Sequence, residues 1–188
     1  MGTSVETKSS GGEAVSLDKY LTFTLGEEEY GLEILKVREI IGLMEITRVP
    51  RMPEFVRGVI NLRGKIIPVI DLRLKFGMAA ADDTRETCII VVDLEGTNMG
   101  VVVDRVSEVL DITADEVEET PEFGAAVDTA FIMGMGKAGD RVVMLLDIGK
   151  VLSGEEVAAI AGAEAHAEEG AALPAAEERS GKEVKGDA

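Results

Sequence analysis

Short apolar runs separated by polar turns dominate the middle of the chain. Runs of four to eight residues, rich in β-branched and aromatic side chains, end at Gly, Asp, Asn or Pro, as is typical of strands joined by tight turns. Only two segments carry apolar residues at helical spacing, Leu72–Phe76 and the stretch that begins at Ile148. The pattern predicts a mostly-β fold with short helices, and its clearest strands are Tyr20–Leu25, Ile66–Leu72, Thr87–Leu94, Met99–Val103 and Arg141–Ile148. Pro68 predicts an edge strand or a bulge.

An internal repeat organises these strands. At a sequence offset of 69, the segment from Leu25 to Ile41 aligns with the segment from Leu94 to Leu110. At an offset of 68, Pro53-Glu54-Phe55 aligns with Pro121-Glu122-Phe123, and at an offset of 76, Val69–Leu72 aligns with Leu145–Ile148. The repeat predicts two copies of one all-β unit, each closed as a barrel without free edges. Chance similarity among Val- and Ile-rich strands is the alternative.

Charge and composition divide the chain into a folded middle and two polar ends. The 188 residues are 46% hydrophobic and 29% charged, which is ordinary for a globular protein, and the net charge is −17. Residues 1–18 are expected to form a flexible tail, and residues 155–188 a short helix followed by a disordered acidic tail. The folded domain is then 19–154, with barrel one at about 19–82, barrel two at about 83–154, and exchange of strands between them left open.

Composition excludes several functions. The acidic balance argues against nucleic acid or anionic lipid as a partner. Cys88 is the only cysteine and His166 the only histidine, so we expect no metal site, no cofactor and no histidine-based catalysis. The longest purely apolar stretches have five residues, and no secretory signal is visible, which predicts a cytoplasmic protein without membrane insertion. The letters of a dinucleotide motif occur at residues 134–139, but a strand follows them where the motif requires a helix.

Several motifs along the folded middle together carry a family resemblance. They are Tyr30-Gly31-Leu32-Glu33-Ile34, Val37-Arg38-Glu39-Ile40, Gly58-Val59-Ile60-Asn61-Leu62-Arg63-Gly64, Pro68-Val69-Ile70-Asp71-Leu72-Arg73, Gly100-Val101-Val102-Val103-Asp104 with Val106, and Pro121-Glu122-Phe123. With these motifs the chain resembles the CheW family, the coupling proteins of bacterial chemotaxis. The resemblance covers about residues 19–154, and its most specific part is the block from Asn61 to Arg73.

The resemblance implies a scaffold. CheW-like proteins are two five-stranded, SH3-like β-barrels from an internal duplication, have no catalytic activity, and join transmembrane chemoreceptors to the histidine kinase CheA; contacts between CheW-like copies in rings are a further implied partnership. Carried over by motif, the receptor-binding residues are Glu39, Arg63, Cys88, Val103 and Val106, and the kinase-binding residues are Val37, Gly58, Gly64, Glu122 and Phe123. Cys88 stands where a valine or isoleucine is more usual in the family.

Other functions stay open beside the scaffold. A CheV-type adapter would carry a receiver domain, for which the segment 155–188 after Gly154 is too short. A regulatory fragment of a CheA-type kinase and an adapter of a non-motility pathway are further alternatives, and a nucleotide-binding enzyme would depend on the glycines at 134–139. Phe123, which follows Pro-Glu as Phe55 does, is expected to be an exposed anchor against the kinase.

Overall fold

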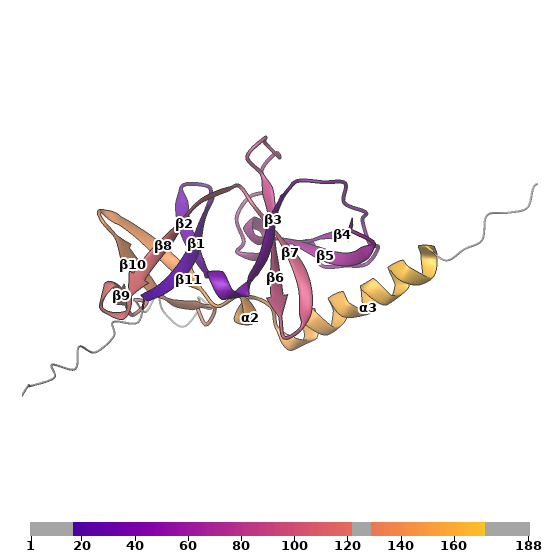
Figure 1. The fold of residues 1–188 in the computed structure, drawn as a ribbon. Helices are drawn as coiled ribbons and strands as arrows, with labels where there is room; N and C mark the ends of the chain where they lie inside the picture. Colours follow the sequence, from indigo (N-terminus) through magenta and orange to yellow (C-terminus); the bar gives the residue numbers. More distant parts are fainter. Residues whose placement is uncertain (1–16, 122–128, 172–188) are drawn as a thin grey trace, which may run out of the picture.

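Two β-sheets and three short or peripheral α-helices make up the described part of the protein. A computed structural model describes residues 17–121 and 129–171. Figure 1 shows the sheets side by side, with α3 running from the middle of the molecule past the end of the five-stranded sheet. The elements are β1 (Leu17–Leu25), β2 (Glu28–Glu33), η1 (Ile34–Lys36), β3 (Val37–Gly42), β4 (Val56–Leu62), β5 (Lys65–Asp71), α1 (Leu72–Lys75), β6 (Cys88–Leu94), β7 (Thr97–Val103), β8 (Arg105–Thr113), η2 (Ala114–Glu116), β9 (Val117–Glu118), β10 (Ile132–Ala138), β11 (Arg141–Leu146), α2 (Ile148–Val151) and α3 (Gly154–Ala171).

The predicted mostly-β fold is confirmed, with a difference in the sheets. One sheet has five strands in the order β3-β6-β7-β5-β4, and the other has six in the order β8-β1-β2-β11-β10-β9. The sixth strand is the two-residue β9, which pairs with the middle of β10. Within the described residues the outer strands of each sheet do not pair with one another, so the sheets are open where closed five-stranded barrels were predicted.

The sheets do not follow the order of the repeats along the chain. β1 and β2 come from the first repeat but join β8, β10 and β11 of the second, while β6 and β7 join β3, β4 and β5. Two parallel pairings connect the repeats, β11 with β2 and β5 with β7. Gly31 lies opposite Leu145 in the first pairing, and Gly100 lies opposite Val69 in the second. Gly31 corresponds to Gly100 at the sequence offset of 69, and Val69 corresponds to Leu145 at the offset of 76. The two pairings are therefore equivalent, and the first two strands of each repeat belong to the sheet of the other repeat.

Both faces of the central strands are buried, which explains the continuous apolar runs. Along β6, Ile90 and Val92 belong to a large core between the two sheets, whereas Ile89 and Val91 fill the interior of the five-stranded sheet. A third cluster, which includes Tyr20, fills the interior of the six-stranded sheet. The core between the sheets makes one folded unit of both halves, since each small sheet alone would bury little apolar surface.

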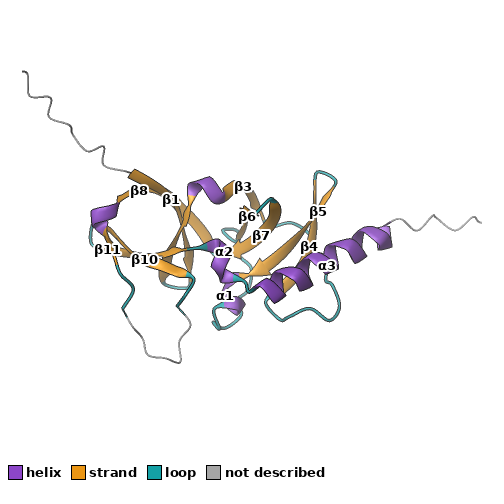
Figure 2. Ribbon diagram, turned by 90° about the horizontal axis from the view of Figure 1, so that it is seen from below, coloured by secondary structure: helices purple, strands orange, loops and turns teal. Residues whose placement is uncertain are grey.

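The two short helices α1 and α2 begin at matching aspartates. The Asp71 carboxylate accepts hydrogen bonds from the backbone N–H groups of Arg73 and Leu74 at the start of α1, and Asp147 caps α2 in the same way through Gly149. α3 runs to Ala171, beyond the short helix predicted from composition, and lies along β4 and β5 in Figure 2.

Pro68 lies in β5, which is an interior strand of the five-stranded sheet, so the expectation of an edge strand is wrong. The parallel ladder between β5 and β7 begins only at Val69. Pro68 has no N–H group to donate, and it fits in β5 because it lies just before this ladder of hydrogen bonds starts.

The backbone also corrects one alignment of the repeat. The Asp71 N–H donates to the carbonyl of Phe55 at 2.7 Å, and the Asp147 N–H donates to the carbonyl of Phe131 at 2.8 Å. The structural counterpart of Phe55 is therefore Phe131, at the sequence offset of 76. The alignment with Phe123 is wrong because it followed the letters Pro-Glu-Phe, whereas strand pairing follows the offset of 76. Glu122 and Phe123 lie outside the described residues.

Candidate partner-binding surfaces

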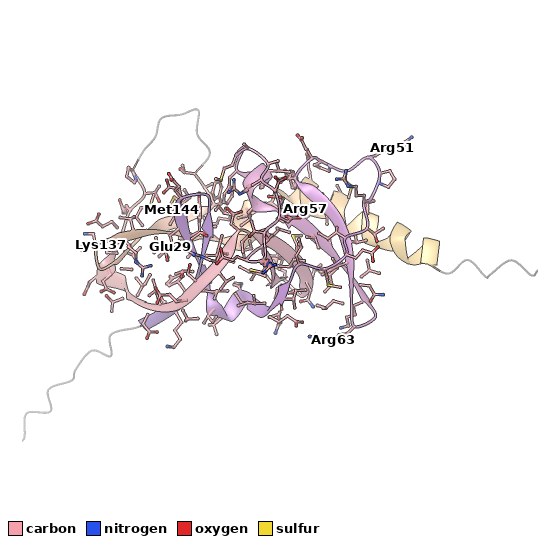
Figure 3. All side chains as sticks on the ribbon, turned by 90° about the horizontal axis from the view of Figure 1, so that it is seen from above. Glu29, Arg51, Arg57, Arg63, Lys137 and Met144 are labelled. Atoms are coloured by element: carbon pink, nitrogen blue, oxygen red, sulfur yellow. The ribbon has the colours of Figure 1, made fainter. Side chains whose placement is uncertain are left out.

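An ion pair marks the end of the β4–β5 hairpin. Arg63 Nη1 and Nη2 donate to Glu39 Oε1 and Oε2 of β3 at 2.8 and 2.6 Å. The hydrogen bond from Arg63 lowers the pKa of the Glu39 carboxyl, and Glu39 raises the pKa of Arg63. Arg63 projects from the hairpin with its side chain 72% exposed (Figure 3). The sequence analysis placed both residues in one site, and the structure brings them together as a fixed pair of charges on the surface.

The hairpin turn holds Arg63 in place. Arg63 and Gly64 are its two central residues and both have positive φ, 51° and 85°, as a type I′ turn requires. The side-chain oxygen of Asn61 accepts a hydrogen bond from the Gly64 N–H at 2.9 Å. Gly64 is exposed, and it serves here as the turn residue that presents Arg63.

Gly58 positions the segment between β3 and β4. Thr47 of that segment pairs with Val59 through two backbone hydrogen bonds of 2.8 Å. A Cβ on Gly58 would lie 2.0 Å from the carbonyl oxygen of Thr47, and the φ of Gly58 is +140°. Only glycine therefore lets this segment approach β4. Gly58 is itself buried, so it can affect a partner by shaping the segment.

The segment that Gly58 positions forms the wall of a groove of about 680 Å³. Apolar side chains from the segment and from β4 line it, and Met44 among them is 36% exposed. At its floor, Arg57 Nε donates to Asp71 at 3.0 Å, and its two terminal nitrogens donate to Asp83 at 3.1 and 2.9 Å. These carboxylates, Asp83 first, raise the pKa of Arg57. Arg48 and Glu54 also line the groove, so it offers a partner both apolar and charged side chains.

A second surface lies where the two sheets meet. Cys88 of β6 is opposite Val103 of β7, and the backbone of Val106 in β8 lies within hydrogen-bonding reach of the Cys88 thiol. Burial raises the pKa of that thiol. The structure thus brings Cys88, Val103 and Val106 together, as predicted for one site. Val103 is only 1% exposed and supports the surface from below, whereas Cys88 and Val106 are half-buried.

Two exposed residues of this surface were missed by the sequence analysis. Ile40 of β3 is 45% exposed and lies opposite Ile90, while Val109 of β8 is 49% exposed and lies opposite Leu21. Ile90 and Leu21 both belong to the core between the sheets, so Ile40 and Val109 extend that core to the solvent. The repeat could have pointed to both residues together, because Ile40 and Val109 occupy equivalent positions at the sequence offset of 69. Leu35 of η1 is a further exposed aliphatic residue, at 90%.

Val37 lies beside the surface between the sheets, on the edge strand opposite to β4. It begins β3, is opposite Val92 of β6 and packs against the core between the sheets. Its half-buried side chain is therefore continuous with the apolar surface of Cys88 and Val106. From its motif, Val37 was predicted to bind the kinase.

The glycines at 134–139 have structural roles. Gly134 and Gly136 lie within β10, where added Cβ atoms would be 2.6 Å from Val117 and 2.9 Å from Ile112. Gly139 lies in the turn to β11 with a φ of +64°. The strand β11 directly follows these glycines, so the helix N-terminus that holds the phosphate in a dinucleotide motif is not formed there. In the described ranges, no helix has the length and apolarity to cross a membrane.

Comparisons with known proteins agree with this geometry. The profile of the CheW-like domain matches residues 19–156. The chain belongs to the CheW family. Chemotaxis protein CheW of Klebsiella aerogenes is 45% identical over 149 residues, covering 79% of this chain and 89% of the relative. Chemotaxis protein CheW of Helicobacter pylori is 36% identical over 134 residues, covering 71% and 81%. The crystal structure of the scaffolding protein TtCheW from Thermoanaerobacter tengcongensis superposes with a TM-score of 0.69 at 38% identity, covering 75% of this chain and 96% of TtCheW.

Proposed function

We propose that this protein is a non-enzymatic cytoplasmic scaffold that couples transmembrane chemoreceptors to a CheA-type histidine kinase. Membership of the CheW family supports the proposal, since its members are adapters of chemotaxis. The observation that carries it is the presence of two separate surfaces on one core, an apolar one between the sheets and a groove of mixed character beside β4. A coupling protein needs two such surfaces, because it must hold two partners at once.

The surface between the sheets suits the receptor. A receptor tip is a helical hairpin, and an amphipathic helix binds an apolar groove through aliphatic side chains at helical spacing. Ile40, Cys88, Val106 and Val109 supply such a surface between the edges of the two sheets. Glu39 lies in β3, the same edge strand as Ile40, and its ion pair with Arg63 of the β4–β5 turn adds a polar border.

The groove beside β4 suits the kinase. It is walled by the segment that Gly58 holds in place, and it combines an apolar wall with an exposed methionine at its rim. Methionine adapts its shape to a partner surface. We assign the predicted kinase contacts Gly58 and Gly64 to this side of the five-stranded sheet, where both act through the backbone they shape. Val37, the third predicted kinase contact, lies on β3 at the other edge of that sheet.

Reconstitution with receptor-containing membranes and a CheA-type kinase tests the two assignments separately. Val109→Glu should weaken binding to the receptor membranes and leave kinase affinity unchanged, and Met44→Glu should do the reverse. Thr97→Glu, at an exposed hairpin position, is the matched control and should change neither. Each surface variant should abolish receptor control of kinase autophosphorylation. The assignment would be contradicted if one of these two variants lost affinity for both partners. It would also be contradicted if neither variant lost affinity for either partner.

A further inference from the structure

The outer face of β10 and β11 is apolar, and no α-helix among the described residues packs along it, although its Met144 also touches the core between the sheets. Alternation along β11 places Val142 and Met144 on the face opposite to Val143 and Leu145, which fill the interior of the six-stranded sheet. Met135 of β10 is the direct partner of Met144 across the hairpin. Val142 is 59% exposed, and the two methionines are half-buried. Figure 3 shows Met144 and Lys137 at the end of the molecule away from α3.

The duplicated half of the protein shows how such a face is covered. At the sequence offset of 76, Met135, Val142 and Met144 correspond to Val59, Ile66 and Pro68. Val59 and Pro68 are buried. α3 packs against β5, and its Ile160 is 2% exposed within the cluster that also contains Ile70 of β5. Figure 2 shows α3 running along β4 and β5.

The duplication therefore supplies two equivalent faces, whereas the described chain supplies one helix to cover them. We propose that the outer face of β10 and β11 docks an amphipathic α-helix of a partner protein, in the way that α3 docks on β5. The helix presents aliphatic side chains at the spacing of Val157 and Ile160. Methionines suit a face that binds such a helix, because their side chains adapt to its shape.

The charges beside the two faces indicate an acidic residue on the partner helix. Glu156 of α3 pairs with Lys75 at 2.6 Å, and both side chains are largely covered, at 25% and 19% exposure. Beside the uncovered face, Lys137 pairs with Glu118, and both are exposed, at 55% and 63%. An exposed pair contributes little and is easily exchanged. A carboxylate on the partner helix would take the place of Glu118. The proposal does not depend on the proposed function.

A helical peptide with the sequence of residues 153–171 is the probe. A hydrocarbon staple between positions 158 and 162, both exposed in α3, keeps the peptide helical and leaves Val157 and Ile160 free. The full chain is labelled with carbon-13 at the methyl groups of its eight methionines and titrated with the peptide by NMR. We expect saturable shifts of Met135 and Met144. Shifts confined to other methionines, or none up to about millimolar peptide, would overturn the proposal.

Variants distinguish a specific face from adhesion of the peptide. Val142→Glu should weaken binding about tenfold or more, because it buries a charge under the helix. Thr97→Glu, at an exposed hairpin position outside both proposed helix-binding surfaces, should leave the affinity unchanged, and the peptide with Ile160→Glu should not bind. The methyl signal of Met99, which is 2% exposed, reports that each variant keeps its core. Equal peptide affinities for Val142→Glu and Thr97→Glu would also refute the proposal.

Discussion

Replacing Gly58 with alanine is expected to detach the segment around Thr47 from β4. The added Cβ would lie 2.0 Å from the Thr47 carbonyl oxygen and 2.7 Å from its carbonyl carbon. Both are backbone atoms, which cannot rotate away as the end of a side chain can. The segment must therefore move, and the groove it walls must change shape.

The cost follows from the contacts that are lost. Two backbone hydrogen bonds join Thr47 to Val59, and each contributes about 1 kcal/mol to the free energy of unfolding. The φ of +140° adds about 1–3 kcal/mol of strain once a Cβ is present. We expect Gly58→Ala to lower the free energy of unfolding by about 3–5 kcal/mol, equivalent to roughly 10 °C in Tm for a domain of this size.

Two glycine variants separate the close approach from a general loss of flexibility. Gly42→Ala meets no described atom within 4 Å and should unfold like the parent protein. Gly64→Ala has open space but a φ of +85°, and should show only the strain. Urea unfolding measures all three, and hydrogen exchange at the amides of Thr47 and Val59 locates the change. If Gly58→Ala unfolds at the same urea concentration as Gly42→Ala, the role given to Gly58 is wrong.

Three further predictions concern the partner surfaces and the junction between the sheets. Arg63→Glu should weaken receptor coupling because it places two acids at the hairpin, while Tm changes by no more than a few degrees. Restored coupling when Glu39→Arg is added would show that the ion pair itself matters. Unchanged coupling in Arg63→Glu alone would exclude a role for the ion pair. Hydrogen bonds from Arg73 lower the pKa of Asp104 below its ordinary 3.8, so its contribution to stability is complete above that pH and is lost as pH falls through the lowered pKa. The difference in unfolding free energy between the parent and Asp104→Asn should therefore be constant near neutral pH and shrink in acid; a difference independent of pH would contradict this. Phe123→Ser should leave folding by circular dichroism and receptor binding intact and weaken kinase affinity about thirtyfold, the loss of a hot spot of about 2 kcal/mol, and unchanged affinity in a titration would refute it.

The strands were predictable because their two buried faces produce unbroken apolar runs. Thr87–Leu94 was predicted and β6 spans Cys88–Leu94, while the predicted Leu72–Phe76 became α1 at Leu72–Lys75. Strands with one open face were less visible. β8 mixes exposed and buried positions and contains a register shift opposite Leu21 to Phe23, so its alternation is broken.

The assignment of strands to sheets was not predictable, because the two repeats are locally alike. Gly31 has similar neighbours whether it lies opposite Leu145 or opposite Val69, and short-range pattern cannot choose between these pairings. The surfaces were predictable in part. Glu39 and Arg63 belong to recognisable motifs, but the exposure of Ile40 and Val109 depends on their lying on edge strands, which is a property of the assembled sheets.

The exchange of strands predicts how fragments of the chain behave. A cut between residues 82 and 83 would separate β1–β5 from β6–β11. Neither fragment then contains a complete sheet, since the six-stranded sheet needs β1 and β2, and the five-stranded sheet needs β6 and β7. Each fragment alone would expose the apolar faces that form the core between the sheets.

Fragments 17–82 and 83–171, purified separately, should therefore lack the near-ultraviolet circular dichroism of packed aromatic residues. In the first fragment, the ring centroids of Tyr30 and Phe76 lie 5.7 Å apart, and the ring of Phe76 stacks on Phe131 of the second fragment at 4.8 Å. The mixture of the two fragments should therefore regain that signal, together with a one-to-one complex in sedimentation. A folded fragment 83–171 on its own would mean that the second repeat completes its sheet without β1 and β2. Because the exchanged strands β1 and β6 also form the floor beneath Val109 and Ile40, recovery of receptor binding should follow the one-to-one complex.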